Sequence, residues 1–337
     1  MIHPHQWRWP LLAAAIAFAF SATTAGAEPR VVRIAQQFGI SYLPLTIIQE
    51  KHLLESEGKK LGLDLTTEWT HFSNGPSMND ALLSGNLDIA SGGVGPLVTA
   101  WARTKGKQDI KGICALDSMP LYLNTIDPNV KTIKDFTERD RIALPAVRVS
   151  LQAVVLQMAA LQMFGKGQEH KLDHLTVSLS HPDGLAQMMS FKSEITAHFT
   201  SAPFMYQELK DKRVHRVLNS YDVFGGPHTF IVVWATAKLY KGDPKIVQAF
   251  LSAVRIAMKD IHDDPAGSAA LWVKANHSKL PVAEAENIVK LPENVFTLTP
   301  QRVTVVANYM ADAQMVPARP STWKDMFIDA IHDLPGS

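Results

Sequence analysis

Short β-prone runs alternate with helical segments over most of this chain, and this alternation limits the folds that it can adopt. The first run, 31–35, is followed by a segment whose apolar residues recur at helical spacing, and the same succession repeats as far as residue 236. Such a pattern predicts an α/β fold with a parallel sheet and right-handed crossovers. After a buried strand expected at 229–236, five helical segments are expected, at 244–262, 265–277, 281–291, 300–315 and 321–331.

Local signals place the loops between these elements. We expect one helix from Pro44 through Leu54, a strand at 87–90, a helix at 97–104 and a strand at 194–199. The glycine-rich segment 92–96 would then be a turn between strand and helix. Its Pro96 lacks the N–H that a phosphate-binding loop would use, so two interpretations stay open, a tight turn or a ligand-binding loop.

Length, charge and cysteine content exclude several classes of protein. The chain has 337 residues, which suits two domains, and 46% hydrophobic residues can form a substantial core. Its 33 Lys and Arg against 32 Asp and Glu give no electrostatic basis for a general nucleic-acid binder, so nucleic acid is not an expected partner. Cys114 is the single cysteine, which excludes an internal disulfide framework, a cysteine zinc cluster and an iron–sulfur cluster held by this chain alone.

The first 27 residues have the pattern of a secretory signal peptide. Arg8 is the positive residue, 11–20 is an apolar run too short for a bilayer span, and Ala25-Gly26-Ala27 is a small-x-small cleavage site. Loss of Arg8 with this segment would leave equal numbers of basic and acidic residues. We therefore expect a near-neutral, soluble, exported protein that begins at Glu28.

Motifs of the common enzyme classes are missing from the sequence. It has no Gly-x-Ser-x-Gly, no His-Glu-x-x-His, no Walker loop and no Gly-x-Gly-x-x-Gly. His262-Asp263-Asp264 stands at an expected helix end, where the three side chains would diverge, and His181-Pro182-Asp183 is read more simply as a helix cap. No enzyme activity, metal or cofactor is expected.

The candidate binding residues lie in loops that follow strands. Ligands of open α/β sheets bind at the carboxyl ends of the strands, where helix N-termini present free N–H groups. Four segments are expected there: 38–42, 92–95, 147–150 and 198–201. The candidate ligand-binding residues in or next to them are Phe38, Ser41, Tyr42, Gly93, Val94, Arg148, Ser150, Gln152, His198, Phe199 and Ser201.

For several of these residues a structural role is an equal alternative. The three serines could be plain helix caps, and Tyr42 could stack on a ligand or cover the core. His198 could donate to an anion or be a satisfied core histidine, and Arg148 could be a clamp or an exposed, solvated side chain.

Several stretches, in their order along the chain, resemble a known family. They are similar to segments of the periplasmic substrate-binding proteins of ABC importers for nitrate, sulfonates such as taurine, bicarbonate and thiamine-precursor pyrimidines. The most specific is 81–90, Ala-Leu-Leu-Ser-Gly-Asn-Leu-Asp-Ile-Ala. Weaker matches are 42–45, 93–96, 150–152, 198–204 and 244–250 with Asp264-Pro265. The chain departs from the family at the polar connector 165–170 and at 191–194, which reads Phe-Lys-Ser-Glu where the family often has Gly-x-Val/Ile-Asp.

The resemblance implies a type II periplasmic-binding-protein fold with two lobes, two chain crossovers and a helical C-terminal region. Lobe 1 would comprise 28–120 and 226–337, and lobe 2 would comprise 121–225. It also implies that the lobes close on a small ligand and that the closed, monomeric protein docks on a membrane permease.

The ligand class stays open at this point. Ser41, Ser150 and His198 could hold a sulfonate or nitrate, whereas Phe38, Tyr42 or Phe199 could stack on a heterocycle. Two other functions remain as alternatives: an enzyme on the same scaffold, although related enzymes rely on a cysteine-rich motif that Cys114 alone cannot provide, and a sensing subunit without a transporter.

Overall fold

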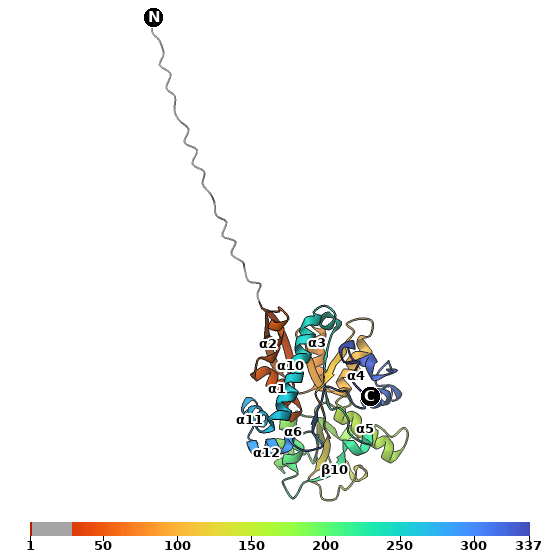
Figure 1. The fold of residues 1–337 in the computed structure, drawn as a ribbon. Helices are drawn as coiled ribbons and strands as arrows, with labels where there is room; N and C mark the ends of the chain where they lie inside the picture. Colours follow the sequence, from red (N-terminus) through yellow and green to blue (C-terminus); the bar gives the residue numbers. More distant parts are fainter. Residues whose placement is uncertain (2–28) are drawn as a thin grey trace.

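The computed structural model describes Met1 and residues 29–337, so the predicted signal peptide lies outside the described residues except for its first methionine (Figure 1). The described strands are β1 Arg30–Gln36, β2 Leu65–His71, β3 Ala90–Gly93, β4 Lys111–Ala115, β5 Asp117–Ser118, β6 Tyr122–Thr125, β7 Ile142–Leu144, β8 Thr176–Ser178, β9 Ala197–Thr200, β10 His215–Asn219, β11 Ile231–Ala235 and β12 Val295–Phe296. The helices are α1 Leu43–Glu50, α2 Leu53–Lys60, α3 Gly75–Leu83, α4 Val94–Thr104, α5 Leu151–Phe164, α6 His181–Met189, α7 Phe204–Glu208, α8 Ser220–Phe224, α9 Ala237–Tyr240, α10 Pro244–Asp263, α11 Pro265–Ala275, α12 Val282–Val289 and α13 Val303–Asp312.

The strands form separate sheets in two parts of the molecule. One sheet has five strands in the order β10-β6-β9-β7-β8, and all of its residues lie between Tyr122 and Asn219. We call this sheet with α5, α6, α7 and α8 the five-stranded part; it lies below α3, α4 and α10 in Figure 1. The β1-β2 pair, the β3-β11-β4 sheet and the remaining helices are drawn from residues before and after it, and we call them the outer part.

The sheets are mixed, so the predicted all-parallel arrangement is wrong in part. β1 is parallel to β2, and β7 is parallel to both β8 and β9, as expected. However, β11 is antiparallel to β3 and β4, and β6 is antiparallel to β9 and β10. A parallel neighbour needs a crossover that returns the chain to the same end of the sheet. The chain reaches β6 and β11 directly from the other part of the molecule, without such a return.

Three local predictions also need correction. The strand expected at 87–90 is β3, Ala90–Gly93, and α4 begins at Val94, because the glycines pair with β11 while Pro96 fits a first helical turn. The helix expected through Leu54 is divided into α1 and α2 by His52, which is left-handed with φ 50°. In place of the helix expected at 321–331 there are two short 3₁₀ turns, because Phe327 and Ile328 pair with Gly112 of β4.

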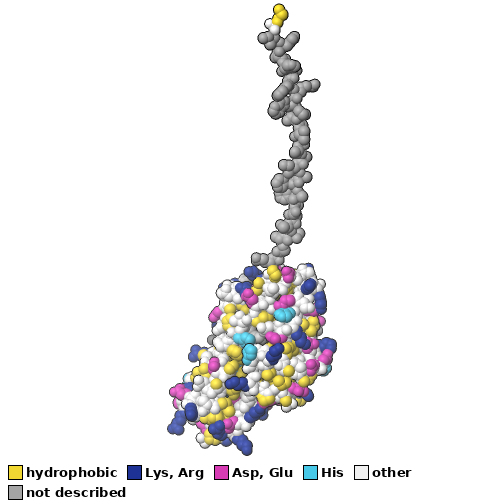
Figure 2. Space-filling model, turned by 90° about the vertical axis from the view of Figure 1, so that its left-hand side faces the viewer, with side chains coloured by type: hydrophobic (Ala, Val, Ile, Leu, Met, Phe, Trp, Pro, Cys, Tyr) yellow, Lys and Arg dark blue, Asp and Glu magenta, His cyan; other side chains and the backbone are white. Residues whose placement is uncertain are grey.

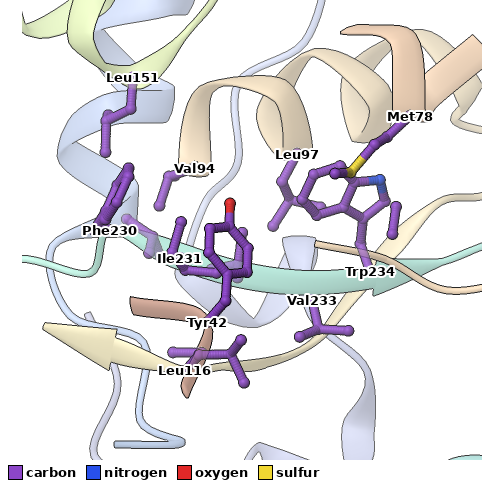
Figure 3. Close-up of a cluster of buried hydrophobic side chains, with 14 of the residues drawn as sticks. Tyr42, Met78, Val94, Leu97, Leu116, Leu151, Phe230, Ile231, Val233 and Trp234 are labelled. Carbon is purple, nitrogen blue, oxygen red and sulfur yellow. The ribbon is translucent and has the colours of Figure 1, made fainter. Parts of the chain in front are cut away.

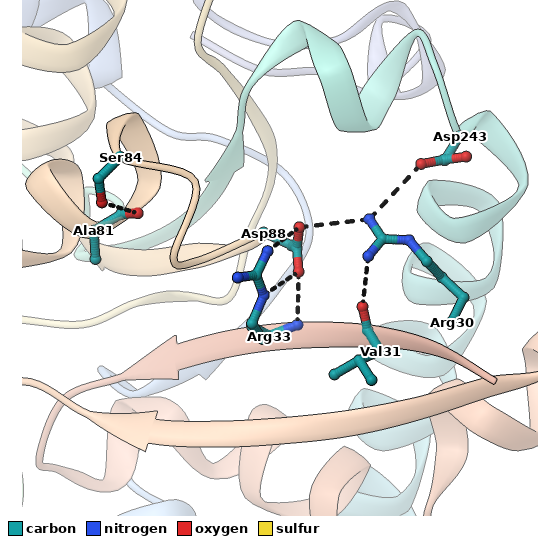
Figure 4. A network of polar contacts seen from close by, with 7 residues as sticks. All are labelled: Arg30, Val31, Arg33, Ala81, Ser84, Asp88 and Asp243. Carbon is teal, nitrogen blue, oxygen red and sulfur yellow. Dashed lines mark hydrogen bonds and ion pairs between the residues drawn. The ribbon is translucent and has the colours of Figure 1, made fainter. Parts of the chain in front are cut away.

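The segment that most specifically carried the family resemblance has a structural role. Asp88 binds Arg33 of β1 through three hydrogen bonds, from the backbone N (2.9 Å), Nε (3.0 Å) and Nη2 (3.2 Å) of Arg33 (Figure 4). Arg30 adds a longer contact of 3.5 Å to the same carboxylate. Burial alone would raise the pKa of Asp88, but the hydrogen bonds from Arg33 outweigh it and hold the pKa below its usual value. Asp88 therefore ties β1 to the start of β3.

We expect Asp88→Asn to lower the free energy of unfolding by about 1–2 kcal/mol at neutral pH, since the ionised acceptor is lost while solvent screens part of the pair. Because the folded-state pKa of Asp88 is lowered, its contribution is present above about pH 4 and is lost as the pH falls through that folded pKa. Urea denaturation should thus show a smaller difference between variant and wild type at about pH 3. Asp243→Asn, at an exposed carboxylate 3.9 Å from Arg30, is the control and should change little; an equal loss in both variants would contradict the role of Asp88.

A continuous hydrophobic core joins the two parts. In Figure 3, Leu151 at the start of α5 lies beside Phe230, and Val94 of α4 lies close to both. Ile231, Val233 and Trp234 of β11 continue this core through the outer part. The first turns of α4 and α5 are therefore in contact where the two parts meet.

Candidate functional site

A small pocket lies at this junction. Its residues from the outer part are Gln37, Phe38, Tyr42, Gly75, Gly93, Pro96 and Phe230. Its residues from the five-stranded part are Pro145, Ser150, Leu151, Gln152 and His181. The pocket has a volume of about 10 Å³, roughly the space that one water molecule needs, so the walls are close together.

Four helices begin at the pocket wall. Gly75 and His181 are the first residues of α3 and α6, Gly93 and Pro96 stand at the start of α4, and Ser150 to Gln152 stand at the start of α5. The first turn of a helix has N–H groups without intrahelical partners and carries the positive end of the helix dipole. Helices from both parts thus direct positive potential at one small space, an arrangement that suits an anion.

Side chains already cap three of these helices. Asn74 accepts from the N–H of Ser77, Ser150 from that of Ala153, and Ser180 from that of Asp183. The N-cap residue of α4 is Gly93, which provides no side-chain cap. Of the four helices, α4 is therefore the one whose first turn has no side-chain cap.

The remaining wall is aromatic and amide in character. None of the residues that line the pocket is Asp, Glu, Lys or Arg. Phe38, Tyr42 and Phe230 supply rings, and Gln37, Gln152 and His181 supply polar groups. Burial, with the nearby Asp117 charge, raises the pKa of Tyr42 well above its usual value, so its hydroxyl keeps its proton and can donate.

The structure brings some of the predicted residues together and leaves others apart. Phe38, Tyr42, Gly93, Ser150 and Gln152 line the pocket. Ser41, Val94, Arg148, His198, Phe199 and Ser201 do not line it.

Each residue that lies apart has a local reason. Ser41 is buried and its Oγ contacts Met119 Sδ at 3.3 Å, and Val94 is packed in the core. Arg148 is exposed, at φ 66°. β9 runs to Thr200, one residue beyond the expected strand end at 199. His198 and Phe199 lie inside this strand without exposed surface, and Ser201, directly after it, is also fully buried.

Sequence reasoning missed seven wall residues: Gln37, Gly75, Pro96, Pro145, Leu151, His181 and Phe230. A signal was available for two of them. Gly75-Pro76 and His181-Pro182 each follow an N-cap residue, and proline in the first turn marks where a helix begins. The sequence predicts His181 only as part of a helix cap and not as a pocket residue. Phe230 had no local signal, because its position depends on the pairing of β11 with a distant strand.

A buried carboxyl group stands behind Phe230. Asp117 Oδ1 accepts from the backbone N–H groups of Phe230 (3.2 Å) and Ile231 (3.0 Å), and Oδ2 has no partner among the described residues. Burial raises the pKa of Asp117 to about 7, against the opposing effects of the two backbone hydrogen bonds and of the nearby Ser41 hydroxyl. This group therefore titrates near neutral pH and must be accounted for in any measurement of protons.

A larger hollow of about 870 Å³ lies elsewhere, between α4, α10 and the C-terminal segment. Its wall includes Trp101, Lys105, Arg255 and Asp325, and none of the predicted site residues. All of its wall belongs to the outer part, so closure of the two parts would not enclose it. We therefore place the candidate site at the smaller pocket, which both parts line.

Within residues 29–337, no group of three or more His, Cys, Asp or Glu is arranged to hold a metal ion. The helices in this range also include none with the length and apolar character needed to cross a bilayer. In the face drawn in Figure 2, acidic and basic side chains are interspersed, as the near-zero net charge suggests.

Comparison with known proteins identifies the fold. No protein-family model and no curated protein matches the sequence. Among solved structures, the alkanesulfonate-binding protein SsuA from Xanthomonas axonopodis pv. citri, bound to MOPS, matches with a TM-score of 0.68 and 18% identity, over 87% of this chain and 96% of that one.

Two further structures support the same result. The periplasmic nitrate-binding protein NrtA from Synechocystis PCC 6803 matches with a TM-score of 0.68 and 15% identity, over 88% of this chain and 84% of that one. A Candida albicans gene product with the generic periplasmic binding protein fold matches with a TM-score of 0.67 and 13% identity, over 88% of this chain and 96% of that one. The chain thus has the α/β periplasmic-binding-protein fold, and the fold that the sequence resemblance implied is confirmed.

Proposed function

We propose that this protein is a periplasmic solute-binding protein that captures a small anion, of sulfonate or nitrate type, in the pocket between its two parts. The observation that carries the proposal is the convergence of four helix N-termini on a pocket with no lining Asp, Glu, Lys or Arg. The structural likeness to binding proteins whose names include sulfonate and nitrate supports it. The proposal includes export through residues 1–27 and delivery of the ligand to an ABC permease in the inner membrane.

The two parts would act as the lobes, with boundaries 28–120 and 226–337 for lobe 1 and 121–225 for lobe 2. Contacts between them support closure around the pocket. Ile40 N donates to Ala202 O at 3.0 Å, and Tyr122 and Tyr206 donate to Glu293 Oε1 at 2.8 and 2.6 Å. In a binding protein of this kind, such contacts form when the lobes close on a ligand by hinge motion.

The test uses protein purified from the periplasmic fraction of an expressing bacterium. Its thermal unfolding would be recorded with nitrate, bicarbonate, taurine, alkyl and aryl sulfonates, aromatic carboxylates and aminopyrimidines. A ligand present at about a thousand times its Kd adds about 4 kcal/mol, which raises Tm by several degrees for a chain of this size. We expect an anion to give this shift and to be recovered unaltered. A shift by aminopyrimidines alone would contradict an anion site, and conversion of a ligand would indicate an enzyme.

Two variants test the location of the site. Gln152→Ala removes an amide from the pocket wall and is expected to weaken calorimetric anion affinity by about tenfold. Arg148→Ala removes an exposed cation outside the pocket and should leave the affinity unchanged. The opposite ranking of the two variants would move the site away from this pocket.

A further inference from the structure

A chain of buried polar side chains leads from the pocket wall into the five-stranded part. Gln152 Nε2 lies 3.2 Å from His181 Nε2, and His181 Nδ1 lies 3.2 Å from His198 Nε2. His198 Nδ1 lies 2.6 Å from Glu208 Oε1, and Asn124 Nδ2 donates to Glu208 Oε2 at 2.9 Å. Gln152 and His181 are 2% and 5% exposed, and His198 and Glu208 are fully buried.

We propose that this row of buried side chains couples anion binding to the uptake of one proton. Glu208 and His198 act as positioning residues that set whether His181 donates or accepts at the pocket wall. The inference rests on the proposed function and deepens it, since it names the charge state in which the site takes its ligand.

The hydrogen bonds allow two arrangements that differ by one proton. In the first, Glu208 is a carboxylate, His198 donates from Nδ1 and therefore has a lone pair on Nε2. His181 Nδ1 faces both this lone pair and Thr200 Oγ1, which lies 3.0 Å away and whose hydroxyl can accept as well as donate. When His181 donates from Nδ1 to these acceptors, a lone pair is left on His181 Nε2, where Gln152 Nε2 donates at 3.2 Å. His181 then presents an acceptor at the pocket wall, and the row of side chains from Gln152 to Glu208 has a net charge of −1, carried by Glu208.

In the second arrangement, one proton has entered from solvent at His181 Nε2, and the Nδ1 proton of His181 has passed to His198 Nε2. His198 now donates to Glu208 and to His181. His181 Nε2–H donates to Gln152, whose amide turns so that Oε1 accepts and Nε2 donates into the pocket. Burial, together with His198, lowers the pKa of His181 well below its usual value, so His181 itself remains neutral in both arrangements. An anion favours the second arrangement, because it gains a donor and the buried charge of Glu208 is balanced.

Gly184 allows α6 to pack directly against the ring of His198. A Cβ at Gly184, in the first turns of α6, would lie 2.6 Å from His198 Nε2 and 2.7 Å from His198 Cε1. Alanine is the better helix former by about 1 kcal/mol, so helix stability alone would not favour glycine at this position. The close approach of α6 to His198 therefore depends on the missing side chain.

Other titratable groups around the pair are accounted for. β7, one of the elements packed around His198 and Glu208, has no titratable residue. The others contribute Asp183 (exposed, on α6), Tyr122 (β6), Tyr206 (α7), and His215 and Arg216 (β10). Asp183 binds Ser180, both tyrosines donate to Glu293, and His215 contacts Val130 O. The Arg216 guanidinium stacks over the Tyr122 ring, 4.5 Å from its centroid. Burial, with Glu293, raises the pKa values of Tyr122 and Tyr206, so neither loses its proton near neutral pH.

The experiment is titration calorimetry of the full chain with nitrate and ethanesulfonate in buffers of different ionisation enthalpy, from about pH 6 to about pH 9. Both probes are anions of strong acids, so any proton taken up comes from solvent. We expect uptake to rise toward one proton per bound anion as the pH rises, and affinity to fall by up to about tenfold per pH unit. Binding without proton uptake anywhere in this range would overturn the coupling and leave the proposed function intact. Absence of binding by every anion would overturn both.

Glu208→Gln gives the sharpest result. The amide can donate to His198 Nδ1, so the neutral His198 donates from Nε2 and His181 presents its Nε2–H permanently. This variant should bind the anion with an affinity that no longer depends on pH and without proton uptake. Gly184→Ala should displace His198 and weaken binding while α6 remains folded, which covers the case in which Glu208→Gln does not fold.

Two control variants distinguish this row of buried side chains from other ionisable groups of the protein. Glu138→Gln removes an exposed carboxylate that contacts His174 at 2.8 Å, a similar pair on the surface, and should retain proton uptake. Asp117→Asn removes the buried carboxyl group whose pKa burial raises to about 7, and it should also retain uptake. Loss of proton uptake in Asp117→Asn with retention in Glu208→Gln would assign the proton to Asp117 and overturn the proposal.

Discussion

Replacing Trp234 by alanine is expected to lower the free energy of unfolding by about 3–5 kcal/mol, the largest stability loss that we predict for a single substitution in this chain. Trp234 is fully buried on β11, where it pairs with Ala90 of β3 (Figure 3). Its indole Nε1 donates to Asn79 Oδ1 of α3 at 2.9 Å, and its Cη2 would lie 3.2 Å from a Cβ placed on Gly92. The substitution would therefore leave a cavity and remove a partner of a buried amide.

Urea denaturation of three variants separates these causes. Trp234→Phe keeps most of the aromatic ring and loses the hydrogen bond to Asn79. It should therefore lower the free energy of unfolding by about 1–2 kcal/mol beyond the cost of the lost ring volume. Trp69→Ala is the matched control: Trp69 is half-buried and donates to Thr67 Oγ1 at 2.9 Å, and it should cost less than half as much as Trp234→Ala. Equal losses at Trp69 and Trp234 would show that the β11 core is not the stabilising centre that its burial indicates.

Replacing Gly95 by alanine is expected to weaken ligand binding by roughly tenfold to a hundredfold while the protein stays folded. A Cβ at Gly95 would lie 2.9 Å from Val149 O and 3.5 Å from Leu151 N, across the junction between the outer and five-stranded parts. Overpacking of this kind costs about 1–3 kcal/mol, and under the proposed function that cost falls on the closed form that holds the ligand. The open form would not experience the clash.

The measurement is calorimetric affinity for the best anion of the panel, with Tm recorded in the absence of ligand. We expect affinity to fall and the ligand-free Tm to stay equal or rise, because alanine favours the helix at the start of α4. A ligand-free Tm that drops in proportion to the affinity would assign the effect to folding and not to closure. Unchanged affinity would mean that the first turns of α4 and α5 do not approach in the bound state.

Much of the site was predictable because its residues stand next to strong local signals. Ser150 at the start of α5 and Gly93 before α4 follow from capping and glycine patterns, and Phe38 and Tyr42 lie in the loop after β1. His198 shows the opposite case. It was expected next to a strand end, where it could reach a ligand, but it lies inside β9 with its ring against Glu208.

The sequence by itself determined most of the helices and strands, their order and the α/β fold class, because alternation of apolar runs, caps and prolines acts over a few neighbouring residues. Tertiary structure alone decided the antiparallel pairing of β11, the contact of Phe230 with the pocket and the line from Gln152 to Glu208. These features join residues from 10 to more than 100 positions apart, for example His198 with Glu208 and Asp117 with Ile231. No local pattern encodes such distances, since they arise only when the packed helices and strands have fixed one another in space.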